Sequence, residues 1–123
     1  MPSHIGRFIL RKNWVREDRT VKQHAFIPPA DGRLSVNEHS MTDVDGLWPV
    51  GEDVARKRNV ELFGRADVAV TTIDRTKLKV EPAPLPGNPT HAEVTDWPPA
   101  KEDRKTKAQA LAAEAEYHPK PYS

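Results

Sequence analysis

The chain has 123 residues, the usual size of one domain, and its 19 basic residues nearly balance its 18 acidic ones, giving a net charge of +1. It has no cysteine, which excludes disulfides, thiolate metal sites and cysteine nucleophiles and favours a reducing cytoplasm. Its apolar runs, such as Phe8-Ile9-Leu10, are too short for a membrane helix or a signal-peptide core.

The first 20 residues are predicted to form a basic N-terminal arm. Ile5, Phe8 and Ile9 are spaced three and four apart, which fits a short helix, although an edge strand fits the same residues. Residues 1–33 carry a net charge of +4 and residues 34–64 one of -3, so the arm could lie against its own domain or meet an acidic partner.

A hairpin is predicted next. Residues 21–29 alternate as a strand does until Pro28-Pro29 ends them, Asp31-Gly32 supplies a turn, and residues 34–37 form a second strand. Residues 38–51 are polar and irregular.

A helix is predicted over residues 52–63, because Glu52 and Asp53 complement its positive end and Gly64 supplies a stop. Residues 66–73 are the clearest strand of the chain. Their run of β-branched side chains is apolar on both faces, which indicates a strand interior to its sheet.

Two further strands are predicted at residues 78–81 and 91–97, separated by the proline-rich loop 82–89. A helix over 101–117 and a flexible tail over 118–123 end the chain. The prediction is therefore an α+β fold with a small, mostly antiparallel sheet of four or five short strands, a mid-chain helix and a C-terminal helix. A single domain is expected over residues 21–117.

The stretch NPTHAEVTDWPP, residues 88–99, holds the main candidate for chemistry. On a strand, His91 and Glu93 share one face while Ala92 and Val94 face the core. A carboxylate beside an imidazole can raise its pKa and fix its tautomer, which suits acid–base catalysis, with help from His39 or Arg65. We favour an ordinary solvated strand face over such a site. The H-x-E motif also occurs in zinc deaminases, but there the remaining zinc ligands are cysteines, which this chain lacks. We therefore predict no metal site and no cofactor.

Ser35 and His39 are close enough in sequence to suggest an activated nucleophile, but no nucleophile elbow surrounds the serine. Trp48 and Trp97 each precede a proline, and each fits either a core anchor or an exposed contact for a protein partner. His91 is a further candidate for contact with a protein partner. Nucleic-acid contacts are a further option, although the near-zero net charge lacks the usual basic footprint. The candidates for those contacts are Arg7, Arg11, Lys12, Arg56, Lys57, Arg58 and Arg65.

The succession of LSV, GRADVAV and NPTHAEVTDWP before an Ala-rich helix resembles a type of small bacterial protein labelled uncharacterised. The resemblance covers roughly residues 25–117 and implies a bacterial, cytoplasmic origin. It carries no functional residue to this chain.

Three functions stay open on the sequence. The leading hypothesis is a non-enzymatic accessory or regulatory subunit that binds another protein, because catalytic constellations are missing and the core is lean. The others are a small enzyme using His91 and Glu93, and a nucleic-acid-binding protein. No membrane partner is expected.

Overall fold

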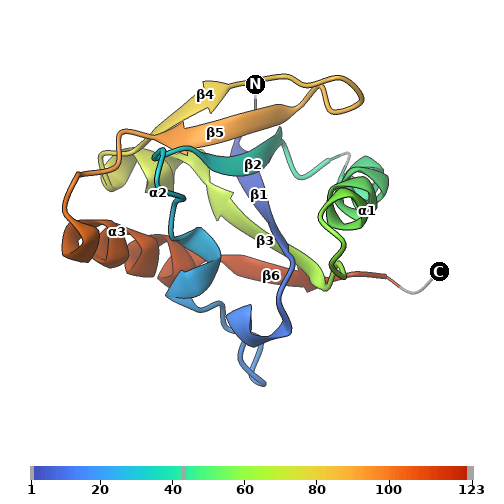
Figure 1. Cartoon of the computed structure of the whole chain (residues 1–123), viewed down its shortest axis with the longest axis horizontal. Helices are drawn as coiled ribbons and strands as arrows, with labels where there is room; N and C mark the ends of the chain where they lie inside the picture. Colours follow the sequence, from blue (N-terminus) through green and yellow to red (C-terminus); the bar gives the residue numbers. More distant parts are fainter. Residues whose placement is uncertain (1, 43, 122–123) are drawn as a thin grey trace.

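Six strands form one antiparallel sheet in the computed structural model, which describes residues 2–42 and 44–121. The order across the sheet is β4-β5-β2-β1-β3-β6 (Figure 1). The predicted α+β class is confirmed, with six strands in place of the four or five expected. The strands are β1 (His4–Ile9), β2 (Leu34–His39), β3 (Gly64–Ala69), β4 (Lys79–Pro82), β5 (His91–Thr95) and β6 (Glu116–Pro119).

The N-terminal segment differs from the arm, helix or edge strand that we expected. Its residues form β1, which pairs with β2 on one side and with β3 on the other, so it is an interior strand. Ile5 and Ile9 are buried in the main core, and Phe8 is buried on the opposite face. Burial on both faces explains why the strand shows no simple alternation of apolar and polar residues.

The predicted hairpin is not formed. Residues 23–26 make a short 3-10 helix, η2 (Gln23–Phe26), and β2 pairs with β1 and β5 instead. The Asp-Gly turn is present: Gly32 has a φ of 71°, and the Asp31 carboxylate accepts the Arg33 amide at 3.0 Å. The 3-10 turn buries Ala25 and Phe26 in the main core and takes the place of the predicted first strand.

The mid-chain helix, α1 (Leu47–Lys57), starts five residues before the predicted position and ends six residues before the predicted end. Pro49 is tolerated because the first turn of a helix leaves its amides unbonded. Asn59, with a φ of 56°, lies just beyond the helix, where asparagine can replace the usual glycine. Gly64 is therefore not a helix stop but the first residue of β3.

The strand predicted at 66–73 ends at Ala69, and a short helix follows, α2 (Val70–Arg75). The helical turn buries Ile73 in the core, so tertiary packing overrides the preference of these β-branched residues for a strand. The last helix, α3 (Lys101–Glu114), stops three residues before the predicted end. Residues 116–119 pair with β3 instead of fraying, while the tail residues 122–123 lie outside the described part.

The helices cover the two faces of the sheet. On one face, α3, α2 and η2 pack on Ile5, Val68 and Val94 in the main core. On the other face, α1 covers Phe8 and Leu62 in a smaller core. Figure 1 shows α1 and α3 on opposite sides of the strands. The face beneath α1 also carries most of the buried polar side chains of the sheet, among them Asn37, His39, Arg65, Asp67 and His91.

Candidate functional site

A closed polar cluster of Arg65, Asp67 and His39 lies on the sheet face beneath α1. Asp67 accepts hydrogen bonds from Arg65 at 2.7 and 2.9 Å and from His39 Nε2 at 2.9 Å. His39 Nδ1 in turn accepts the Met41 amide at 3.1 Å, which fixes the proton on Nε2. Both nitrogens of this imidazole are therefore used inside the fold.

Burial opposes ionisation of Asp67, but the hydrogen bonds from His39 and Arg65 outweigh it and hold the pKa of its carboxyl below the usual value. The Arg65 side chain is 2% exposed, and its guanidinium lies 5.0 Å from the centre of the Trp48 ring. Its Nη1 has no hydrogen-bond partner among the described residues, and the ring face compensates part of that loss.

His118 brings a second imidazole to the same carboxylate, with Nε2 3.3 Å from Asp67 Oδ2 but without hydrogen-bond geometry. The cavities found in the described part of the chain are lined by other residues. The cluster therefore joins β2, β3 and β6 and lies apart from these cavities.

His91 is 9% exposed, so the solvated strand face expected for it is wrong at this position. Its Nδ1–H donates to the Ala83 carbonyl at 2.7 Å, and the Ala83 amide donates to the His91 carbonyl at 2.9 Å. These bonds tie the base of the 82–90 loop to β5. Its neighbours Ala92 and Val94 are fully buried in the core, as the period of two predicted.

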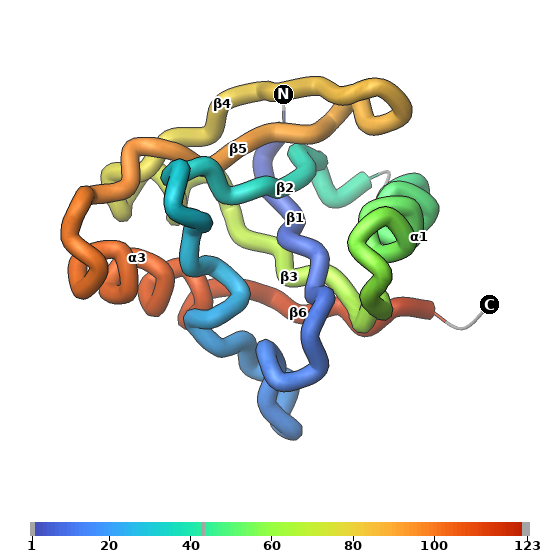
Figure 2. Tube along the Cα trace, viewed as in Figure 1, coloured from blue at the N-terminus to red at the C-terminus, as the bar shows by residue number. Residues whose placement is uncertain are grey.

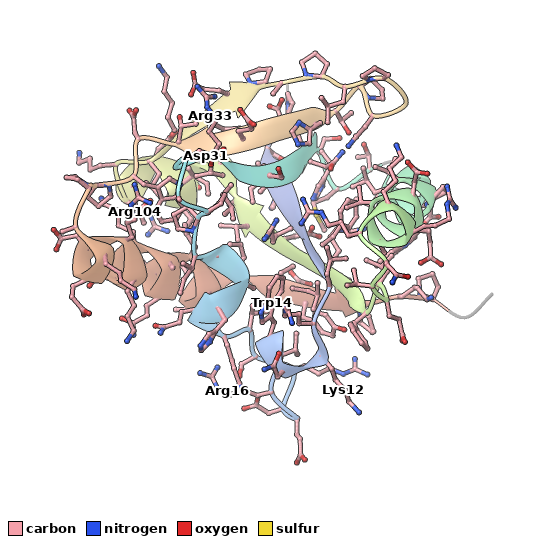
Figure 3. All side chains as sticks on the ribbon, in the orientation of Figure 1. Lys12, Trp14, Arg16, Asp31, Arg33 and Arg104 are labelled. Carbon is pink, nitrogen blue, oxygen red and sulfur yellow. The ribbon has the colours of Figure 1, made fainter. Side chains whose placement is uncertain are left out.

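Glu93 does not bond to His91; its carboxylate accepts Arg33 at 2.8 Å, at the part of the surface where Figure 3 labels Arg33. His39 is committed to Asp67. The three weak catalytic candidates, His91, Glu93 and His39, thus take three different partners, and no hydrogen bond joins any two of them.

The two tryptophans predicted as protein contacts lie in different environments. Trp97 is buried and donates Nε1–H to the Val94 carbonyl at 2.9 Å, while Trp48 is partly buried on Arg65.

The basic residues predicted as nucleic-acid contacts do not form one surface. Arg11 and Lys12 are exposed beyond β1, with Lys12 labelled in Figure 3. Arg56 and Lys57 pair with Asp53. Arg7 and Arg58 lie together at a cavity beneath α1 and the 82–90 loop.

This cavity is the inner end of a surface groove between α1 and the 82–90 loop, which we call the α1–loop groove. Figure 2 shows the two segments at the same end of the molecule. The outer part has a volume of about 390 Å³ and the inner cavity about 140 Å³. The outer part is lined by Val50, Asp53, Val54, Lys57, Arg58, Leu85, Pro86, Gly87 and Asn88. The inner cavity is lined by Arg7, Phe8, Leu10, Ser35, Val36, Asn37, Val54, Arg58, Leu85, Asn88 and His91.

The loop wall of the groove is held by local bonds. Leu85 and Asn88 exchange two backbone hydrogen bonds across Pro86-Gly87, and Gly87 has a φ of 74°. Proline first and a left-handed glycine second are the requirements of a type II turn. Beneath it, Asn37 Nδ2 donates to the Asn88 side chain at 2.6 Å. The sequence PLPG is typical of such a turn. The position of the turn against α1, however, depends on contacts between residues distant in sequence.

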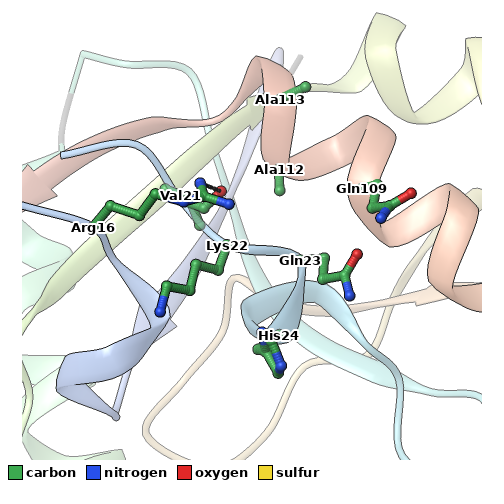
Figure 4. Close-up of a pocket in the computed structure, with 8 residues that line it drawn as sticks. All are labelled: Arg16, Val21, Lys22, Gln23, His24, Gln109, Ala112 and Ala113. Carbon is green, nitrogen blue, oxygen red and sulfur yellow. Dashed lines mark hydrogen bonds between the residues drawn. The ribbon is translucent and has the colours of Figure 1, made fainter. Parts of the chain in front are cut away.

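A second depression of about 400 Å³ lies between residues 21–24 and α3 (Figure 4). Arg16 at its rim donates to the Val21 carbonyl. Its lining includes none of the exposed large hydrophobic side chains of the described part of the chain, whereas Leu85, 50% exposed, lines the α1–loop groove. The groove is therefore the better candidate for binding.

Comparison with protein-family models, curated proteins and solved structures found no match. In the described part of the chain, no helix has the length and apolar character needed to cross a membrane. Within residues 2–42 and 44–121, His, Asp and Glu side chains form no group of three placed to hold a metal ion.

Proposed function

We propose that this protein acts by binding another protein, as an accessory or regulatory subunit, and that the α1–loop groove is its binding surface. The partner segment that fits is extended, with an apolar anchor and acidic neighbours. The observation that carries the proposal is Leu85, half exposed at the edge of a groove whose opposite wall holds Val50 and Val54. Together these three side chains give the groove an apolar lining that an anchor side chain of a partner can cover.

Charge supports an acidic segment. Arg58, at the end of α1, is exposed and forms no ion pair with the described residues, whereas the neighbouring Lys57 is paired with Asp53. An unpaired cation beside an apolar groove attracts and orients an acidic partner.

Rigidity of the loop also supports binding. Prolines 82, 84, 86 and 89 restrict its backbone, and the turn at 85–88 and the bonds to Asn37 and His91 fix its position. A wall that is ordered before binding loses little entropy when the partner arrives.

The test is selection of peptides from a displayed random library on the purified full chain, its Leu85→Glu variant and the control Ile27→Glu. Ile27 is 40% exposed and lies outside the groove, so it matches Leu85 in exposure. We expect an apolar residue flanked by Asp or Glu in the selected peptides, affinity at least about tenfold weaker on Leu85→Glu, and no loss on Ile27→Glu. Equal affinity for Leu85→Glu, or no selection at all, would contradict the proposal.

Acid–base catalysis by His91 is a second candidate, supported by one contact. Because Nδ1–H is committed to the Ala83 carbonyl, the neutral ring has its basic nitrogen at Nε2, which has no hydrogen-bond partner among the described residues. Turnover of activated esters or phosphate monoesters that is lost in His91→Gln, with folding retained, would support it. Turnover unchanged in His91→Gln would contradict it.

A further inference from the structure

We propose that the inner cavity of the α1–loop groove binds a compact oxyanion, a carboxylate or phosphoryl group, between the guanidinium groups of Arg7 and Arg58. This inference deepens the proposed function. Its extension to an acidic group of a partner segment rests on that function. The cavity volume of about 140 Å³ is several times the share of one water molecule in the liquid, about 30 Å³, so a group of this size fits.

Arg7 lies where β1 and β2 separate. Their ladder ends at Gly6 and Asn37, and beyond it Arg7 Nη1 donates to the Ser35 carbonyl at 3.0 Å and Nε to the Ala25 carbonyl at 2.9 Å. The second terminal nitrogen, Nη2, has no hydrogen bond to the described residues. The guanidinium is thus held in place with one donor free.

The charge of Arg7 is not neutralised within the described structure. Its partners are two neutral carbonyls and the ring of Trp14, whose centre lies 5.5 Å away. Burial and then the positive charge of Arg58 lower the pKa of Arg7 to about 10. No Asp or Glu appears among the described residues that line the inner cavity. Two cations facing one cavity without an anion repel each other, and a bound oxyanion would relieve both.

Further donors surround the same space. The Ser35 hydroxyl and the Asn88 side-chain nitrogen form no hydrogen bond to the described residues, and the Asn88 side-chain oxygen accepts Asn37. Charge-assisted bonds from guanidinium groups, completed by a hydroxyl and an amide, are the usual coordination of carboxylates and phosphates.

The test is a titration of the full chain with sodium phosphate, and separately with sodium acetate, at constant ionic strength, followed by ¹⁵N NMR of the Arg7 Nε–H group. We compare the wild type with Arg58→Met and with Arg56→Met, a matched control on the same helix whose partner is Asp53. We expect a saturable shift at Arg7 with at least one of the anions. Arg58→Met should weaken binding roughly tenfold or more, the size of one lost charge-assisted bond, and Arg56→Met should leave it unchanged.

No saturable shift at Arg7 with either anion, or equal weakening by the two substitutions, would overturn the inference. Binding of the selected peptides tests the oxyanion site and the proposed function separately. If selected peptides bind the groove but exchange of their Glu for Gln leaves affinity unchanged, the oxyanion site and the preference for acidic neighbours are wrong, while binding of a protein segment at the groove stands. If phosphate binds at Arg7 and no peptide is selected, the site stands and the proposed function fails.

Discussion

Arg65 and Arg7, from paired strands β3 and β1, occupy opposite kinds of environment. Arg65 forms two hydrogen bonds to the Asp67 carboxylate and is sealed beneath Trp48. Arg7 is held by carbonyls and Trp14, faces Arg58, and opens to a cavity. A buried cation bonded to its own carboxylate is neutralised inside the fold, whereas Arg7, held only by neutral groups, is the cation for which we propose an outside anion. The comparison therefore separates structural polar residues from those available for binding.

The largest expected effect is on the closed cluster. Asp67→Asn leaves the buried Arg65 without its carboxylate, so we expect a loss of about 3–5 kcal/mol in the free energy of unfolding, measured by urea denaturation. Asp53→Asn removes an exposed carboxylate that pairs with Arg56 and Lys57, and it should change stability far less. Equal effects of the two substitutions would show that the cluster is not a structural ion pair.

A smaller effect is expected at Gly6, which lies against the cluster. A Cβ atom at this position would lie 2.8 Å from Arg65 Cδ and 3.0 Å from Asp67 Oδ1, and would displace the pair. We expect Gly6→Ala to cost about 1–3 kcal/mol by overpacking. At Gly46 an added Cβ meets no atom within 4 Å, so Gly46→Ala is the matched control. A Gly6→Ala protein as stable as Gly46→Ala would contradict the close packing described.

The loss of stability at low pH should depend on the same carboxylate, that of Asp67. Because the pKa of Asp67 is lowered in the folded state, its contribution is complete above the unfolded value of about 3.8 and is lost as pH falls through the lower, folded value. The stability difference between wild type and Asp67→Asn should therefore be present at about pH 4 and shrink as pH falls below it. Denaturation curves from about pH 4 downward check it, and a difference that grows below that pH would contradict it.

The smallest stability effect is expected in the groove. Arg58 is exposed, so Arg58→Met should change the unfolding free energy by no more than about 0.5 kcal/mol. Removal of its charge should nevertheless raise the pKa of Arg7 above about 10, because that charge is one of the two causes of the depression. NMR titration of the Arg7 guanidinium measures the change. An unaltered pKa would show that the two cations do not share the cavity.

Local patterns predicted the fold class and several elements. The alternation around Ala92 and Val94 predicted β5 and its core-facing side, although the strand ends at Thr95 instead of residue 97, and the Asp-Gly pair marked one turn. The predicted boundaries of α1 and β3 were wrong. Asn59 lies at the end of the helix in place of Gly64, and packing of Ile73 favours a helical turn after β3. Propensity is a weak guide where tertiary contacts decide.

The polar sites could be predicted only in part. His39, His91, Arg7 and Arg65 all stood out as candidates, but their roles depend on partners far along the chain. The Asp67 carboxylate reaches His39 across 28 positions, and Arg7 reaches the Ser35 carbonyl across the same number. Local sequence contains no information on such pairings until the order of the strands is known.

The most direct test of the central claim is ¹⁵N chemical-shift mapping of a selected acidic peptide on the full chain. The account predicts the largest shifts at Val54, Arg58, Leu85 and Gly87, in the two walls of the α1–loop groove. Largest shifts in the depression lined by Lys22, His24 and Gln109, or around Ile27, would contradict it.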